Sequence, residues 1–114
     1  MSGINYKFNQ WRQSGEQAQE WSSKAYKLLG CNTTSDTLNG YKIGKVLYLH
    51  HVKGLNAQEI RELSGKNGLP TNTVKSVIKG FSRQAGQESI LAYNTAMEML
   101  QDEQERAVLE RMYN

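Results

Sequence analysis

The chain has 114 residues, of which 38% are hydrophobic and 22% are charged, a composition that suits a small soluble protein with a modest core and excludes a disordered chain. A single cysteine excludes an intrachain disulfide framework, and no run approaches the ~18 apolar residues of a membrane span. Because no apolar run follows Met1, we expect no signal peptide and a cytoplasmic location, associated with the nucleoid if the protein binds DNA.

The charges are unevenly distributed, although the net charge is only +3. Residues 1–86 carry twelve Lys and Arg against five Asp and Glu, whereas residues 87–114 carry two against six. A basic body beside an acidic tail is typical of a polyanion-binding surface next to a second interaction surface. An ordinary solvated acidic helix is the alternative explanation of the tail.

The first predicted helix covers about residues 10–29, after a loose arm at residues 1–9. Its apolar side chains recur at a heptad-like spacing and are Trp11, Ala18, Trp21, Ala25 and Leu28. The helix begins at Gln10 or at Ser14, and Gly30 ends it. The polar run at residues 31–39 predicts a loop, in which Cys31 has no neighbouring His or Cys and is expected to be structural.

Residues 41–53 predict a broadly apolar helix that is buried on two sides. We expect Gly54 to end this helix, and we expect Gly40 and Gly44 to weaken its first turn by about 1 kcal/mol each relative to alanine.

The next helix has a well-defined start. Asn56 and Glu59 have the spacing of a capping box, while Leu55 and Ile60 have that of a hydrophobic staple. Ile60 and Leu63 are predicted to point inward, and Gly65 is predicted to end the helix before a turn at residues 66–68.

A further helix is predicted to start near Pro70 or Thr71, where threonine can cap. Its apolar stripe consists of Val74, Val77, Ile78 and Phe81. The opposite face carries Asn72, Thr73, Lys75, Ser76 and Lys79, with Arg83 just beyond it. These side chain types can pair with bases and phosphates, and no acidic residue occurs between Glu62 and Glu88.

Residues 54–83, which read GLNAQEIRELSG and then LPTNTVKSVIKGFSR, resemble the helix-turn-helix of LuxR-type regulators and of region 4 of bacterial sigma factors. The matching residues are Gly54-Leu55, Glu59-Ile60, Leu63, Leu69 and Thr73-Val74-Lys75. The chain departs from the pattern in a longer turn at residues 66–68 and in Arg61, where the family prefers a small residue. The resemblance implies that the second helix enters the DNA major groove. The expected DNA-binding residues are Lys66, Thr71, Asn72, Thr73, Lys75, Ser76, Lys79 and Arg83.

The C-terminal segment at residues 87–113 predicts one long helix or two short ones, after a hinge at residues 82–86. Its expected apolar stripe consists of Ile90, Tyr93, Met97 and Leu100. Asp102 and Glu105 can form a second capping box. A last apolar face is formed by Ala107, Val108, Leu109 and Met112, and we expect it to contact a second copy or another protein.

No catalytic pattern emerges, so we expect neither an enzyme nor a cofactor. The run at residues 40–45 is one residue short of a phosphate-binding loop, and Val46 stands where that motif needs Ser or Thr. His50 and His51 have no third ligand nearby, so we expect no metal site, with His50 partly buried and His51 at the surface.

The sequence thus predicts an all-α protein, a single helical domain over residues 1–114 of about five helices with a central helix-turn-helix. The predicted function is sequence-specific binding of double-stranded DNA by a small prokaryotic or viral transcriptional regulator. We expect a homodimer that forms through the C-terminal or the N-terminal helix. The alternative is a helical adaptor that binds a protein partner, such as a component of the transcription machinery, without contacting DNA. RNA binding has weaker support, since the chain has no arginine-rich run.

Overall fold

The computed structural model describes residues 22–31, 38–65, 68–81 and 86–113. All the secondary-structure elements formed by these residues are helices, which confirms the all-α prediction. The helices are α2 (Ser23–Leu29), α3 (Gly40–His51), α4 (Ala57–Ser64), α5 (Thr71–Ile78), α6 (Gln87–Gln101) and α7 (Glu103–Tyr113). The described part of the chain therefore has six helices where about five were predicted, because the C-terminal segment divides into two.

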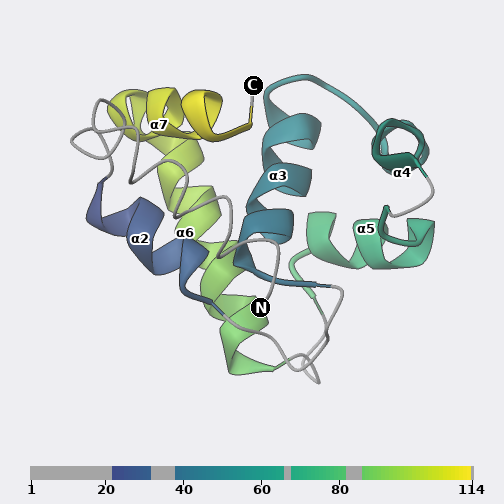
Figure 1. Cartoon of the computed structure of the whole chain (residues 1–114), viewed down its shortest axis with the longest axis horizontal. Helices are drawn as coiled ribbons and strands as arrows, with labels where there is room; N and C mark the ends of the chain where they lie inside the picture. Colours follow the sequence, from purple (N-terminus) through teal and green to yellow (C-terminus); the bar gives the residue numbers. More distant parts are fainter. Residues whose placement is uncertain (1–21, 32–37, 66–67, 82–85, 114) are drawn as a thin grey trace.

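The central element is α3, which has α2, α6 and α7 on one side and α4 and α5 on the other (Figure 1). Eight of its twelve residues are buried. Ile43, Leu47 and Tyr48 are fully enclosed, so their burial stabilises both halves of the molecule at once. The prediction of a helix buried on two sides is confirmed. Val52 caps the helix, and Gly54 adopts a positive φ of 73° in the loop beyond it.

Two glycines of α3 allow neighbouring helices to come close. A Cβ atom at Gly40 would collide with the carbonyl oxygen of Leu28. A Cβ atom at Gly44 would collide with the hydroxyl of Tyr113 and would lie 2.8 Å from Leu28 Cδ2. The sequence indicated only that these glycines weaken the helix. The structure shows that α2 and α7 occupy the space that the missing side chains leave.

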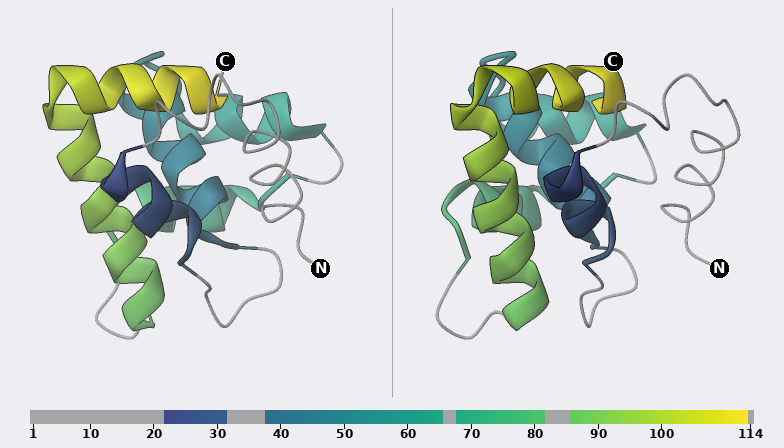
Figure 2. Two further views of the ribbon diagram at one scale, coloured as in Figure 1. Left: turned by 60° about the vertical axis from the view of Figure 1, so that its left-hand side comes forward. Right: turned by 90° about the vertical axis from the view of Figure 1, so that its left-hand side faces the viewer.

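A sharp corner separates α6 from α7, and it is visible in both views of Figure 2. At this corner Asp102 has an extended backbone, with φ −105° and ψ 125°. Its Oδ1 accepts hydrogen bonds from the backbone N–H groups of Gln104 at 2.9 Å and Glu105 at 3.2 Å. Capping by Asp102 is therefore confirmed. The Glu105 carboxylate instead accepts a hydrogen bond of 2.8 Å from the Ser22 hydroxyl, which ties α7 to the start of α2.

The buried face of α6 differs from the predicted one. Ile90, Tyr93 and Met97 are only partly buried, and of the expected stripe Leu100 alone is buried. The buried residues of the helix are Ser89, Ala92, Thr95, Ala96, Met99 and Leu100. Small side chains at four of these positions let α6 approach α3 closely. The prediction was wrong because it followed the largest apolar side chains.

The start of α2 also corrects a prediction. Ser22 has an extended backbone, and its Oγ accepts a hydrogen bond of 3.1 Å from the N–H of Ala25. The predicted continuous helix over residues 10–29 is therefore wrong at Ser22, which is extended and caps α2 because its side-chain oxygen accepts a hydrogen bond from the first turn. Ala25 and Leu28 are buried as expected, and Gly30 caps the end. The predicted arm, Trp11, Trp21 and most of the loop at residues 31–39 lie outside the described residues.

Candidate nucleic-acid interface

The local signals of α4 form as the sequence predicted. Asn56 Oδ1 accepts a hydrogen bond of 2.8 Å from the N–H of Glu59, and Glu59 Oε1 accepts one of 3.0 Å from the N–H of Asn56. Gly65 ends the helix with a positive φ of 67°. Arg61 does not pack between the helices as a small residue would, since its Nη1 donates a hydrogen bond of 2.8 Å to the carbonyl oxygen of Gly65. The start and the end of α4 are thus set by its own residues.

The inward position predicted for Leu63 is wrong, because 67% of this residue is exposed. Ala57 and Ile60 are the buried residues of α4. In an α-helix each residue advances by about 100°, so Leu63 lies about 120° away from Ala57 around the helix axis. The neighbouring helices cover the Ala57 side, and Leu63 is left at the surface.

The second helix of the unit, α5, is shorter than predicted. It begins at Thr71 after Pro70, and no side chain caps it, so the predicted capping by threonine is wrong. At its end the Gly80 N–H donates to Val77 O at 3.0 Å, and the Phe81 N–H donates to Ser76 O at 2.8 Å. This pair of bonds is a Schellman motif.

Phe81 therefore lies beyond α5, although it was predicted to extend the apolar stripe of the helix. Gly80 and Phe81 both have positive φ values, 86° and 68°. The Phe81 side chain nevertheless packs against the core, as do Val74, Val77 and Ile78. Because the helix stops at Ile78, the exposed Lys79 belongs to the turn that caps it.

The outward face of α5 carries most of the residues predicted to contact DNA. Asn72, Lys75, Ser76 and Lys79 are exposed, whereas Thr71 and Thr73 are partly buried. Lys66 and Arg83 lie outside the described residues. Neither Lys75 nor Lys79 forms an ion pair with another described residue. The structure thus brings six of the eight predicted residues together on one short segment.

Hydrogen bonding within α5 limits what Ser76 can offer to a ligand. Its hydroxyl donates a bond of 3.0 Å to the carbonyl oxygen of Asn72, four residues earlier. The Ser76 oxygen can still accept a hydrogen bond, while its proton is engaged by the backbone. The Asn72 side chain lies at the surface in the first turn, where amide donors and acceptors can reach a ligand.

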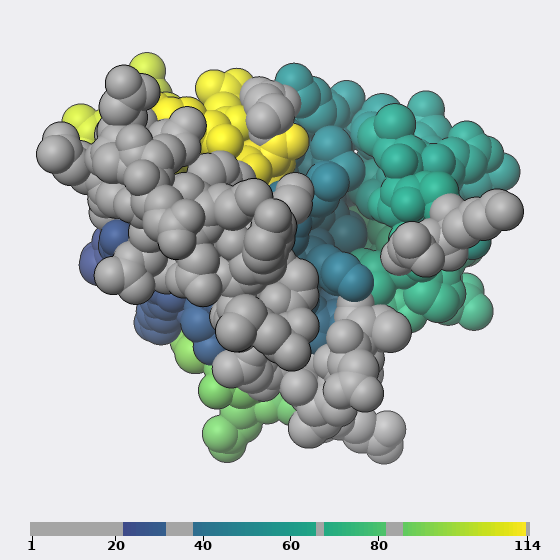
Figure 3. Space-filling view, viewed as in Figure 1, coloured from purple at the N-terminus to yellow at the C-terminus, as the bar shows by residue number. Residues whose placement is uncertain are grey.

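The position of the α4–α5 unit leaves its surface open on one side of the molecule. The space-filling view shows its atoms gathered on the opposite side of α3 from α2, α6 and α7 (Figure 3). Val108, Leu109 and Met112 of α7 are buried in the protein's own core.

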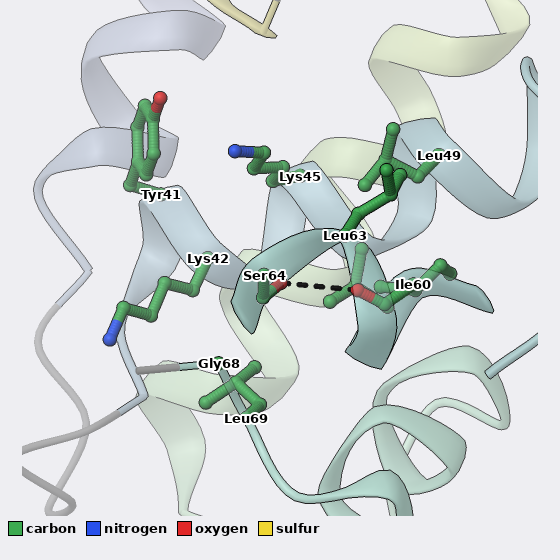
Figure 4. A pocket seen from close by; sticks show the side chains of 10 residues that line it. Tyr41, Lys42, Lys45, Leu49, Ile60, Leu63, Ser64, Gly68 and Leu69 are labelled. Atoms are coloured by element: carbon green, nitrogen blue, oxygen red, sulfur yellow. Dashed lines mark hydrogen bonds between the residues drawn. The ribbon is translucent and has the colours of Figure 1, made fainter. Parts of the chain in front are cut away.

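A pocket between α3 and α4 was not predicted. It has a volume of about 280 Å³. Its lining residues are Tyr41, Lys42, Lys45, Val46, Leu49, Ile60, Leu63, Ser64, Gly68 and Leu69 (Figure 4). The spacing of Lys42 and Lys45 places them one turn apart on α3, but only the packing of α4 beside them creates a hollow. No local sequence signal indicates such an arrangement.

Other reactive groups have structural surroundings. Cys31 is buried, and its Sγ donates a bond of 3.3 Å to the carbonyl oxygen of Lys27. Burial, together with the charge of Glu88, raises the pKa of the thiol from 9.0 to about 11. His50 is partly buried and its Nδ1 lies 2.8 Å from the carbonyl oxygen of Leu55, while His51 is exposed, as predicted. Partial burial, followed by the charge of His50, lowers the pKa of His51.

The described residues show no group of three or more His, Cys, Asp or Glu side chains that could hold a metal ion. None of the described helices is both long enough and apolar enough to span a membrane. Comparison of the chain with protein-family models, curated proteins and solved structures gives no match. The helix-turn-helix resemblance therefore stays a prediction made from the residues themselves.

Proposed function

We propose that this protein binds double-stranded DNA by placing the outward face of α5 in the major groove. The observation that supports the proposal is the exposure of Asn72, Lys75 and Ser76 on the side of α5 away from the buried Val74 and Val77, with Lys79 exposed in the turn that caps the helix. The buried side of α5 packs against α3 and α4. These two helices therefore hold α5 in place while its polar side faces outward. A rigidly held helix with cationic and amide side chains is how many proteins read duplex DNA.

The side chains of this face have complementary roles in the proposed complex. Lys75 and Lys79 would neutralise phosphates or contact guanine, because an ammonium group donates to both. Asn72 would pair with adenine, which presents one acceptor and one donor in the major groove. Ser76 would accept a hydrogen bond, since its proton is used inside the helix. The partly buried Thr71 and Thr73 would approach the DNA backbone at the start of α5.

The length of α5 supports the proposal of a homodimer. Eight residues form a helix of only about 12 Å, which reaches few base pairs. Two copies on two half-sites would provide the specificity that a transcriptional regulator needs. Because the apolar side of α7 is used inside the chain, a dimer contact by this helix would rely on its charged side, with Glu110 and Arg111 exposed. The N-terminal helix predicted at about residues 10–29, of which residues 10–21 lie outside the described residues, is the other candidate for the contact.

A second candidate function is that of an adaptor for another protein. The observation that favours it is Leu63, a large apolar side chain exposed on α4 beside Leu55, Glu59 and Glu62. An apolar side chain with two carboxylates next to it suits a partner that presents a basic, apolar surface. This candidate uses α4, whereas DNA binding uses α5, so mutations can separate the two.

The direct test is fluorescence anisotropy of a labelled random-sequence duplex, titrated with protein at two salt concentrations. Binding that weakens steeply with salt supports the proposal, because each neutralised phosphate releases counterions. Absence of binding at both salt concentrations, with the protein folded by circular dichroism, would reject DNA binding and favour the adaptor function. Selection of a preferred site from a random pool would then define the target.

A further inference from the structure

The exposed side of α4 combines apolar and acidic side chains. A shallow hollow of about 300 Å³ lies there, and its lining residues are Leu55, Glu59, Glu62 and Leu63. Their spacing of four, three and one residues places them along one side of the helix and of the loop before it. Both glutamates are exposed, and Leu63 is 67% exposed. We call these four residues the acidic stripe.

The two carboxylates of the acidic stripe have hydrogen bonds but no cationic partner among the described residues. Glu59 Oε1 accepts the bond of 3.0 Å from the N–H of Asn56, and Glu62 Oε1 accepts one of 3.5 Å from Gln58 Nε2. Neither carboxylate forms an ion pair with another described residue. Their negative charge can therefore attract a cation from outside the chain.

The outward face of α5 carries the opposite charge. Lys75 and Lys79 are exposed there, and neither forms an ion pair with another described residue. The sequence from Leu63 to Gln87 contains no acidic residue, so no carboxylate of that segment neutralises them. The long apolar stem of a lysine can also cover an exposed leucine, since only its ammonium group needs water. This face thus matches the acidic stripe in charge and in apolar content.

The presence of both surfaces on neighbouring helices makes this part of the molecule complementary to itself. The two helices pack against each other, and both lie on the side of α3 away from α6 and α7 (Figure 1, Figure 3). Each has eight residues, so the two surfaces match in length. A second copy related by a two-fold rotation brings α4 of each copy opposite α5 of the other, and the same contact then forms twice.

We propose that two copies of this chain associate in this way, with the acidic stripe of one copy against the outward face of α5 of the other. Glu62 pairs with Lys75 of the partner subunit, and lysine stems cover Leu63. The association does not depend on DNA binding, but its consequence rests on the proposed function. Because the contact covers the residues assigned to DNA, a duplex and a second copy compete for α5. The contact differs from that of a dimer on two half-sites, which leaves α5 uncovered.

Sedimentation equilibrium of the full chain without DNA tests the contact. We expect a dimer at low salt whose dissociation constant rises with salt, because exposed charges are screened. Glu62→Lys and Lys75→Glu should each raise the dissociation constant about tenfold, since each replaces two attractions in the dimer by two repulsions. An equimolar mixture of the two variants should regain the original affinity, because each reversed charge then meets its opposite across the contact.

Glu110→Lys is the matched control and should leave the dissociation constant unchanged. Glu110 is exposed on α7, the helix that offers another dimer contact. An equal loss in this variant and in Glu62→Lys would overturn the proposal, as would failure of the mixture to recover affinity. A protein that is monomeric at low salt would also overturn it. Binding of a lysine-rich amphipathic peptide by such a monomer, abolished by Leu63→Ser, would assign the acidic stripe to another protein.

DNA titrations separate this proposal from the proposed function. Glu62→Lys leaves the outward face of α5 intact and should bind a duplex at least as tightly as the original protein. Self-association with the expected charge dependence but without DNA binding would reject the proposed function alone. DNA binding by a protein whose self-association is unaltered by Glu62→Lys would overturn the contact between copies and leave the proposed function standing.

Discussion

The hydroxyl of Tyr113 donates a hydrogen bond of 2.9 Å to the backbone carbonyl oxygen of Tyr41, which lies 72 residues earlier in the chain. The bond joins the last turn of α7 to the first turn of α3. The two rings meet edge to face with their centroids 5.1 Å apart, and the Tyr113 ring also lies 5.8 Å from that of Tyr48. Burial raises the pKa of Tyr113 well above its usual value, so the hydroxyl keeps its proton and remains a donor.

Replacing Tyr113 by phenylalanine keeps the ring and removes the donor. We expect Tyr113→Phe to lower the free energy of unfolding by about 1 kcal/mol, the usual net value of one hydrogen bond. Urea denaturation measures the change. The matched control is Tyr93→Phe, because the Tyr93 hydroxyl has no hydrogen bond within the described part of the chain. An equal loss in both variants would mean that the bond to Tyr41 does not stabilise α7 on α3.

Gly40→Ala should destabilise the protein, although helix propensity alone predicts a gain of about 1 kcal/mol. The new Cβ would collide with the backbone carbonyl oxygen of Leu28, which cannot move away as a side chain can. Gly40 also donates a backbone hydrogen bond of 3.1 Å to the carbonyl oxygen of Cys31, so α2 and α3 would have to separate there. We expect a net loss of about 2 kcal/mol, measured by urea denaturation.

Gly86→Ala is the control for this substitution. A Cβ atom at Gly86 has nothing within 4 Å, and the φ of −66° suits alanine. The change in the free energy of unfolding should stay within about 0.5 kcal/mol. A stabilised Gly40→Ala protein would show that propensity outweighs packing at the start of α3, contrary to our expectation.

The helix ends could be predicted from the sequence because each depends on residues within a few positions. The capping box of Asn56 and Glu59 and the capping by Asp102 are contacts of this kind. Exposure of the α5 outer face also agrees with the apolar spacing of Val74 and Val77. Such features need no knowledge of the rest of the fold.

Helix faces that depend on distant neighbours could not be predicted in this way. Its spacing of three residues from Ile60 predicts an inward position for Leu63, yet none of the described helices covers that side of α4. In α6 the small Ala92 and Ala96 are buried in preference to Tyr93 and Met97. The pocket between α3 and α4 likewise depends on how the two helices pack against each other. The spacing of apolar residues within one helix gives no information about that packing.

The buried thiol of Cys31 should make stability depend on alkaline pH. Its pKa is raised from 9.0 to about 11, mainly by burial, so the folded state keeps a proton that the unfolded state loses above pH 9. This contribution is fully present below pH 9 and is lost as the pH rises toward 11. The loss should amount to about 3 kcal/mol at most, and urea denaturation at several pH values measures it.

Cys31→Ala is the control, because Tyr113 and other groups also titrate above pH 9. The difference in the free energy of unfolding between the original protein and the variant should shrink as the pH rises from 9 to 11. A difference that is constant over this range would mean that the thiol titrates normally in the folded state.

Lys75→Ala/Lys79→Ala tests the electrostatic part of the proposed DNA contact. We expect weaker binding to every duplex and a salt dependence whose slope is shallower by about 2, one unit for each lost phosphate contact. Anisotropy titrations over a range of salt concentrations give the slope. Lys24→Ala/Lys27→Ala removes the same net charge from α2 and should change the slope much less. Unchanged affinity and slope in the α5 variant would remove both lysines from the interface.

Asn72→Ala tests the base-reading part of the contact and should leave the salt slope nearly unchanged. The Asn72 side chain is exposed in the first turn of α5, where it can pair with adenine in the major groove. Its loss should relax the preference at one position of the selected site, by about 1–3 kcal/mol of discrimination. Site selection from a random duplex pool, carried out in parallel with both proteins, measures this. A preferred site identical in both would show that α5 positions the protein without reading sequence through Asn72.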